Sequence, residues 1–200
     1  MSAVPTPRPP ISGRFGALEV VPLSGSMGAE IRGLDLRTLD DSGFKVLYEA
    51  YLDHLLVLVR EQTLSDEDQV AVARRFGTLE MPPAANERSS HQHYDGPPEI
   101  TVVSNIKVNG VPIGELGDGE VIWHSDYSFR EVIAGMRILR AVKLPPAAAG
   151  GNTEFCARLR TDSVSAIAMS VPWEGYAGEA QFFHLGLLIL ESSSWRYKKS

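Results

Sequence analysis

The sequence predicts a mainly β domain with flanking helices, an α+β arrangement. Short runs of β-branched and apolar residues, separated by Gly, Pro and Ser turn signals, occur along most of the chain. Helical signals are confined to two segments in its first 80 residues. A chain of 200 residues, 44 % hydrophobic and 22 % charged, is long enough for one domain whose core needs no disulfide or metal to fold.

The first part of the chain predicts a flexible segment followed by two strands. Residues 1–14 contain four prolines and form the expected lead-in. Ala17–Pro22 and Ala29–Leu34 are short β-type runs, and the turn signal Ser24–Ser26 separates them. We therefore expect two strands joined by a turn.

The next segment predicts two helices with a strand between them in the sequence. The first is indicated by apolar residues at helical spacing, preceded by two aspartates that suit the positive end of a helix: Phe44, Leu47, Tyr48, Tyr51 and Leu52, with Asp40 and Asp41 ahead. The second has Ser65 as its N-cap, acidic residues at 66–68 and Gly77 at its C-terminal end. Between them, the continuous apolar run Leu55–Val59 predicts a strand buried on both faces.

Strands and loops replace helices in the rest of the chain. We expect strands at 100–104, 121–123, 136–144 and 152–156, and a long loop at 105–120, which holds four glycines. Residues 157–200 have short, weakly periodic apolar clusters, a run of three serines and a basic end. They predict a loosely packed C-terminal tail.

Charge and cysteine content exclude several classes of protein. A formal net charge of −6 argues against a nucleic-acid binder and against a polybasic membrane-surface protein. Cys156 is the only cysteine, which excludes a disulfide framework. No apolar run approaches the roughly 20 residues of a membrane span, and the N-terminus lacks a signal-peptide core. We therefore expect a cytoplasmic protein with a small-molecule substrate and with no nucleic-acid or membrane partner.

The strongest chemical signal is the run Trp123–Asp126. His124 and Asp126 are separated by one residue, so in a strand both side chains project from the same face. Imidazole and carboxylate suit a divalent first-row metal, and with a second His they form the two-His-one-carboxylate set of Fe(II) oxygenases. Taken alone, such a pair is more often a surface histidine hydrogen-bonded to a nearby aspartate.

Several motifs in order resemble one known family. They extend from about Leu18 to Cys156 and comprise Gly28–Leu36, Leu58–Gln62, Ala73–Leu79, Gly117–Glu120, Trp123–Phe129, Leu144–Pro146 and Gly150–Thr153. In these motifs the sequence is similar to the TauD/TfdA family of Fe(II)- and 2-oxoglutarate-dependent dioxygenases. The block at 117–129 is the most specific of them.

The resemblance implies a double-stranded β-helix, a jelly-roll fold related to cupins. It implies that His124 and Asp126 bind Fe(II), that Thr153 hydrogen-bonds 2-oxoglutarate, and that Glu120 and Tyr127 line the substrate pocket. The implied reaction uses O2 and couples the oxidative decarboxylation of 2-oxoglutarate to hydroxylation of a small, anionic organic substrate.

Departures from the family pattern bear on the substrate. Pro82 stands where the taurine enzymes have a His, and Glu120 stands where they have an Asn. A carboxylate repels a sulfonate, so we expect a substrate other than taurine. We expect His91 and His93, in a nearby polar stretch, to be solvated, with a pocket-lining role as the alternative. His54 ends a predicted helix, where a cation suits the dipole, and we interpret it as structural.

The family's second iron-binding His and its 2-oxoglutarate-binding Arg have no clear counterpart. His184 and Arg196 have a family-like spacing, but only 47 residues follow Thr153 and the surrounding pattern differs. We interpret residues 15–156 as the N-terminal part of a dioxygenase domain and 157–200 as an unrelated or degenerate tail of a truncated product. An internal deletion that keeps the distal motif is the alternative.

The missing distal residues leave two functional alternatives open, an active dioxygenase and an inactive remnant. Two protein ligands without a third hold Fe(II) poorly, and 2-oxoglutarate without the Arg lacks a bidentate partner. A jelly roll that is incomplete at its C-terminus also leaves strand edges unpaired. We therefore expect the chain to aggregate or to form a homo-oligomer.

Overall fold

The structure, a computed structural model, describes residues 9–25, 27–81, 96–104, 107–112, 115–116, 135–142, 153–159, 164–170 and 186–190. Its helical elements are a short 3-10 helix and two α-helices: η1 (Leu36–Thr38), α1 (Asp41–His54) and α2 (Asp66–Arg74). The strands are β1 (Gly13–Phe15), β2 (Leu18–Pro22), β3 (Ala29–Arg32), β4 (Val57–Val59), β5 (Val103–Ser104), β6 (Lys107–Val108), β7 (Val111–Pro112), β8 (Glu115–Leu116), β9 (Arg137–Ala141), β10 (Thr153–Leu159), β11 (Val164–Ser170) and β12 (Gly186–Leu190).

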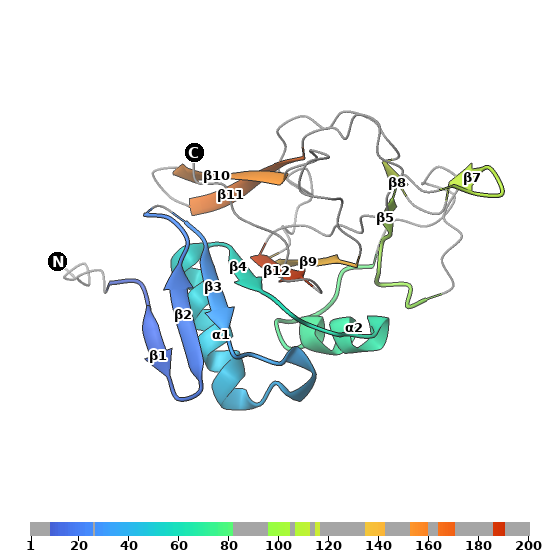
Figure 1. The fold of residues 1–200 in the computed structure, drawn as a ribbon. Coiled ribbons are helices and arrows are strands. Elements are labelled where there is room, and N and C mark those ends of the chain that lie inside the picture. The colour runs from blue at the N-terminus through green and yellow to red at the C-terminus, as the bar shows by residue number, and fades with distance from the viewer. Residues whose placement is uncertain are drawn as a thin grey trace.

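A six-stranded mixed sheet organises the described fold (Figure 1). Its strand order is β1-β2-β3-β4-β12-β9. The pairs β1–β2 and β2–β3 are antiparallel, whereas the pairs β3–β4, β4–β12 and β12–β9 are parallel. Three further pairs form separate two-stranded sheets: β10 with β11, β5 with β8, and β6 with β7. The mainly β prediction with few helices is confirmed at this level.

The core lies between this sheet and α1, which packs against β2, β3 and β4 (Figure 1). Leu47 and Ala50 of α1 and Val57 and Val59 of β4 are fully buried in one cluster. Burial of each large aliphatic side chain contributes about 1.5–3 kcal/mol relative to leaving it exposed. Leu58, which alternation places on the opposite face of β4, is also only 1 % exposed. The predicted strand buried on both faces is therefore confirmed in β4.

The start of each α-helix follows the predicted capping signal, whereas α2 ends at Arg74 with Arg75 as its C-cap, ahead of the Gly77 that the sequence predicted. The Asp40 side chain accepts a hydrogen bond from the Gly43 amide at 2.7 Å, and bonds from Gly43 and Ser42 lower the pKa of that carboxyl. Ser65 and Asp68 form a reciprocal capping box at the start of α2. The first helix ends at Leu55, which adopts a left-handed conformation with φ 65° and turns the chain into β4.

The N-terminal segment is tied to the end of α1. Ile11 donates its amide to the Asp53 carboxylate at 2.8 Å, and its carbonyl lies 2.8 Å from Nε2 of His54. β1 starts at Gly13 and pairs with β2, so the described fold begins inside the expected lead-in 1–14. His54 is buried and has a structural contact, as its place at the helix end predicted.

The long loop expected at 105–120 is wrong in part. Residues 107–112 form the β6–β7 hairpin, whose turn residues Asn109 and Gly110 have φ of 51° and 81°. An Asn-Gly pair is favoured in two-residue hairpins because the tight turn requires positive φ at both positions. The strand expected at 100–104 is shorter, since only Val103–Ser104 pairs with β8.

Two described strands lie within residues 157–200, and β10 extends into that range. β11 forms an antiparallel hairpin with β10, and β12 lies between β4 and β9 in the main sheet. Among the described residues, no helix has the length and apolar character needed to cross a membrane.

Candidate active site

The residues proposed for catalysis lie mainly outside the described part of the chain. Glu120, His124, Asp126 and Tyr127 belong to the segment 117–134, of which nothing further is described. β8 ends at Leu116 just before this segment, and β9 begins at Arg137 just after it. Thr153 is the first residue of β10 and is paired with Ser170 of β11. The expected proximity of Thr153 to the His-x-Asp pair stays a prediction.

The other residues that the sequence singled out for the site also lie outside the described part of the chain. Pro82, His91, His93, His184 and Arg196 lie outside the described residues. Within the described ranges, no group of three or more His, Cys, Asp or Glu side chains could hold a metal ion. Any metal site in this chain would therefore include residues outside the described ranges, and the segment 117–134 is the candidate.

Tyr51 links α1 to the chain that immediately follows this segment. Its hydroxyl donates a hydrogen bond to the carbonyl of Gly135, across 84 positions of sequence. Burial, and then the charge of nearby Tyr48, raise the pKa of Tyr51 above its ordinary value of 10.0. The phenol therefore stays protonated and able to donate at neutral pH. Tyr51 thus fixes one end of the connection that carries His124 and Asp126.

Arg140 secures β9, the strand after this connection, to the start of α2. The Arg140 side chain is 8 % exposed, and its guanidinium donates to the Ser65 carbonyl at 2.9 Å and to Oδ1 of Asp66 at 2.7 Å. A largely buried guanidinium needs such partners, because leaving it uncompensated costs several kcal/mol. Strand β9 is consequently held to the first helical turn of α2 as well as to the sheet.

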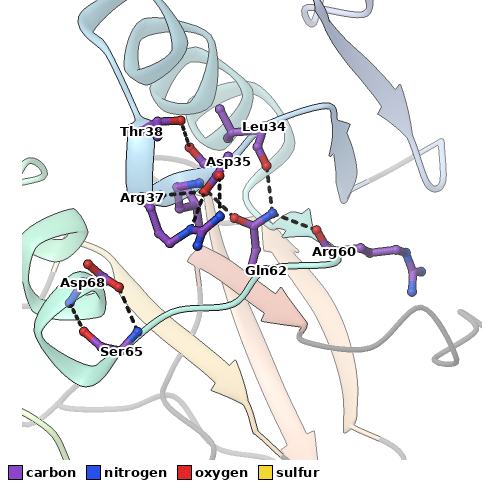
Figure 2. A network of polar contacts seen from close by, with 9 residues as sticks. Leu34, Asp35, Arg37, Thr38, Arg60, Gln62, Ser65 and Asp68 are labelled. Carbon is purple, nitrogen blue, oxygen red and sulfur yellow. Dashed lines mark hydrogen bonds and ion pairs between the residues drawn. The ribbon is translucent and has the colours of Figure 1, made fainter.

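Gln62 joins two of the sequence motifs to one another (Figure 2). Its side chain is buried, donates to the carbonyls of Leu34 and Arg60 at 2.8 Å each, and accepts from the Leu36 amide at 2.9 Å. A buried amide left without these partners would cost about 1–3 kcal/mol. The motifs Gly28–Leu36 and Leu58–Gln62 are thus fixed together by a buried polar contact.

A second contact joins the same two motifs. Nε of Arg60 lies 3.3 Å from Oε1 of Glu30, and both side chains are largely buried. Together with Gln62, this ion pair gives the first two motifs a structural role in the described fold. They shape the sheet beside β4 and contribute no metal ligand among the described residues.

The local sequence gives little indication of these supporting roles. Tyr51 belongs to the apolar stripe of a predicted helix, and no local signal marks its hydroxyl as a long-range donor. Arg140 stands in a predicted strand, where an isolated arginine between apolar residues could have indicated a buried ion pair.

Comparison with known proteins decides the family. The family described as "Taurine catabolism dioxygenase TauD, TfdA family" matches residues 19–160. The chain belongs to the TauD/TfdA family. The match includes the segment 117–134 with His124 and Asp126, and it ends close to the position at which the motifs end.

Family members similar to this chain include enzymes named as alpha-ketoglutarate-dependent dioxygenases. The (S)-phenoxypropionate/alpha-ketoglutarate-dioxygenase of Delftia acidovorans is 32 % identical over 148 residues, covering 69 % of this chain and 46 % of the relative. The alpha-ketoglutarate-dependent 2,4-dichlorophenoxyacetate dioxygenase of Cupriavidus pinatubonensis is 36 % identical over 144 residues, covering 68 % and 48 %.

Solved structures of family members have a similar fold. A putative alpha-ketoglutarate-dependent taurine dioxygenase from Burkholderia xenovorans superposes with a TM-score of 0.54 at 30 % identity, covering 70 % of this chain and 45 % of that one. A second taurine dioxygenase structure from the same organism gives a TM-score of 0.51. The chain spans just under half the length of the curated relatives that it matches.

Proposed function

We propose that this chain is the N-terminal part of an Fe(II)- and 2-oxoglutarate-dependent dioxygenase that hydroxylates a small, anionic organic substrate. The observation that carries the proposal is the motif Trp123–Asp126 inside a family match over residues 19–160. The two curated relatives described above are named as alpha-ketoglutarate-dependent dioxygenases of (S)-phenoxypropionate and 2,4-dichlorophenoxyacetate. In this proposal residues 15–156 contribute the first part of a double-stranded β-helix.

Each candidate residue has a role that its chemistry suits. His124 and Asp126 supply an imidazole and a carboxylate, a donor pair that fits a divalent first-row metal. Thr153 offers a hydroxyl that donates to a carboxylate of 2-oxoglutarate. The iron, when bound, supplies the oxidation of 2-oxoglutarate and substrate by O2. The residues of the chain hold and orient these groups and exclude water.

Glu120 and Tyr127 would line the substrate pocket and so constrain the substrate. The carboxylate of Glu120 repels a sulfonate or carboxylate placed directly beside it. An anionic substrate would therefore bind with its acidic group away from Glu120 and near a donor such as the Tyr127 amide. Because Glu120 replaces the Asn of the taurine enzymes, it disfavours a sulfonate in the position that taurine takes there.

A second candidate function is a non-enzymatic family member with an incomplete ligand set. The observation that favours it is that His184 is the only histidine of the sequence after Asp126. Loss of even an outer partner of a metal ligand typically costs about 10–100-fold in affinity or activity, so loss of a direct ligand costs at least as much. This candidate predicts weak Fe(II) binding and no succinate production.

An anaerobic titration separates the two candidates. Fe(II) and 2-oxoglutarate are added to the full chain, the charge-transfer absorption of the metal–2-oxoglutarate complex is recorded, and succinate is assayed in air with phenoxy-carboxylates. The dioxygenase proposal expects a band and succinate, both lost in His124→Ala and Asp126→Ala. His91→Ala is the matched control and should retain both signals.

His184→Ala then tests the third ligand. Loss of the band in this variant would identify His184 as the missing ligand. A band that survives in His184→Ala points to a third ligand from elsewhere. The absence of both the absorption band and succinate contradicts the dioxygenase proposal for this chain and supports the non-enzymatic candidate.

A further inference from the structure

Strand β12 lies in the main sheet but outside the family match. The match ends at residue 160, and β12 spans Gly186–Leu190. Figure 1 shows β12 between β4 and β9, both of which lie within the match. A segment with no assigned relationship to the family thus occupies an interior position of the sheet that the family residues build.

The register places β12 between buried residues on both sides. Leu188 is paired with Leu58 of β4 and Leu139 of β9, which are 1 % and 7 % exposed. The neighbouring row places Leu187 between Val57 and Ile138, which are 0 % and 9 % exposed. The sequence Gly-Leu-Leu-Ile-Leu is a continuous apolar run, the pattern typical of a strand in the interior of a parallel sheet.

Strand β9 depends on β12 for its place in the sheet. Among the described strands, β9 pairs with β12 alone, through all five residues from Arg137 to Ala141. On its other side β12 pairs with all three residues of β4. Without β12, the facing edges of β4 and β9 would both present unpaired amides and carbonyls, which favour association with other chains.

We propose that residues 186–190 are an in-built strand that covers the facing edges of β4 and β9 and so completes the six-stranded sheet within one chain. The occupant of the position between β4 and β9 is the chain's own segment, and its apolar sequence and parallel direction match both neighbours. The tail is then required for folding, although it lies beyond the residues that relate the chain to its family. The proposal does not depend on metal binding or turnover.

This proposal makes a different prediction from the uncovered edges expected from the sequence. Uncovered edges predict aggregation or a homo-oligomer, whereas a covering strand from the same chain predicts a monomer. A second copy has the same segment and could insert it by strand exchange. Oligomeric state and strand protection therefore have to be measured together.

Hydrogen exchange on the unmodified full chain tests the strand directly. The amides of 187–189 should exchange within about tenfold of those of 57–59, because both strands belong to one cooperative sheet. Sedimentation over a tenfold concentration range should show a monomer. Rapid exchange at 187–189 overturns the proposal. A dimer that loses this protection on dilution also overturns it, because the strand then comes from a second copy.

A proline variant provides the second test. Leu188→Pro removes a backbone donor inside an interior strand and should lower Tm by at least about 6 °C, with concentration-dependent association. Ser193→Pro, five residues further along the same tail, is the matched control and should melt like the unmodified chain. A Leu188→Pro variant that melts at the unmodified Tm as a monomer overturns the proposal. If Leu188→Pro fails to fold, hydrogen exchange on the unmodified chain still decides.

Discussion

Strands β4 and β12 lie side by side in the main sheet but are held in place differently. β4 is preceded by α1 and its left-handed exit at Leu55, and it is followed by the Gln62 contact that fixes its far end. β12 has five register pairs with β9 and three with β4, and both partners lie far away in the sequence. Both strands pair with a neighbour on each side, but β4 is also framed by contacts of the residues just before and after it, whereas β12 is placed by its pairing with β4 and β9.

The comparison shows that a short apolar run can indicate a strand of the sheet even where the residues around it do not. Leu55–Val59 and Leu185–Leu190 have the same continuous apolar character. The continuous apolar run of the first predicts a strand buried on both faces. The second was placed in a loosely packed tail because its flanks are weakly periodic. Whether residues 157–200 are unrelated to the family remains a separate prediction, and their sheet pairing does not decide it.

The largest expected effect comes from placing a charge in either strand. Leu58→Asp buries a carboxylate at a position that is 1 % exposed and should cost more than about 4 kcal/mol, which abolishes a cooperative melt. Leu188→Asp should be equally damaging if β12 is as central as β4. Circular dichroism melts give the measurement, with Leu52→Asp, at a site 54 % exposed, as the control. A native-like melt of Leu188→Asp alone would show that the two strands are not equivalent.

Removal of the Arg140 anchor should have an intermediate effect. Arg140→Met deletes charge-assisted bonds to Ser65 and Asp66, and Asp66 stays partly solvated at the start of α2. We expect the free energy of unfolding to fall by about 2–3 kcal/mol, which corresponds to a fall in Tm of about 4–12 °C. Arg37→Met breaks an exposed pair with Asp35 and is the control that should leave Tm unchanged.

A double-mutant cycle then relates this anchor to β12. Suppose that both Arg140 and β12 hold β9. The double variant Arg140→Met/Leu188→Ala should then lose a free energy of unfolding that differs from the sum of the losses in the two single variants by at least about 0.5 kcal/mol. Strict additivity would indicate that β9 is positioned by one of them alone. Chemical denaturation of the four proteins gives the energies.

The smallest expected effect concerns Tyr51. Tyr51→Phe removes the donor to the Gly135 carbonyl near the protein surface and should cost about 0.5–1 kcal/mol at neutral pH, or about 1–4 °C in Tm. Because the pKa of Tyr51 is raised above 10.0 in the folded chain, its contribution is fully present below pH 10 and is lost as pH rises through the folded-state pKa. The difference in Tm between Tyr51→Phe and the unmodified chain should therefore be smaller in melts above pH 10 than in melts at neutral pH. A difference that is constant across this range would contradict the assignment.

Local chemistry in the sequence determined much of this protein. Periodicity and capping predict features that depend on residues close together in the sequence. These features are the caps at Asp40 and Ser65, the apolar stripe of α1 and the buried run of β4. The Asn109-Gly110 pair is also a local signal, and it indicates the turn of the β6–β7 hairpin within the segment that was expected to be a loop. The ordered motifs that include His124 and Asp126 were sufficient to indicate the family.

Tertiary structure alone decided which distant segments meet. Nothing near Tyr51 indicates Gly135, and nothing near Arg140 indicates Ser65 and Asp66, because these bonds span 74 to 84 positions of sequence. The pairing of β12 with β4 and β9 has the same origin. A parallel strand takes its hydrogen bonds from other strands and none from its own sequence neighbours, so its place in a sheet depends on the whole chain.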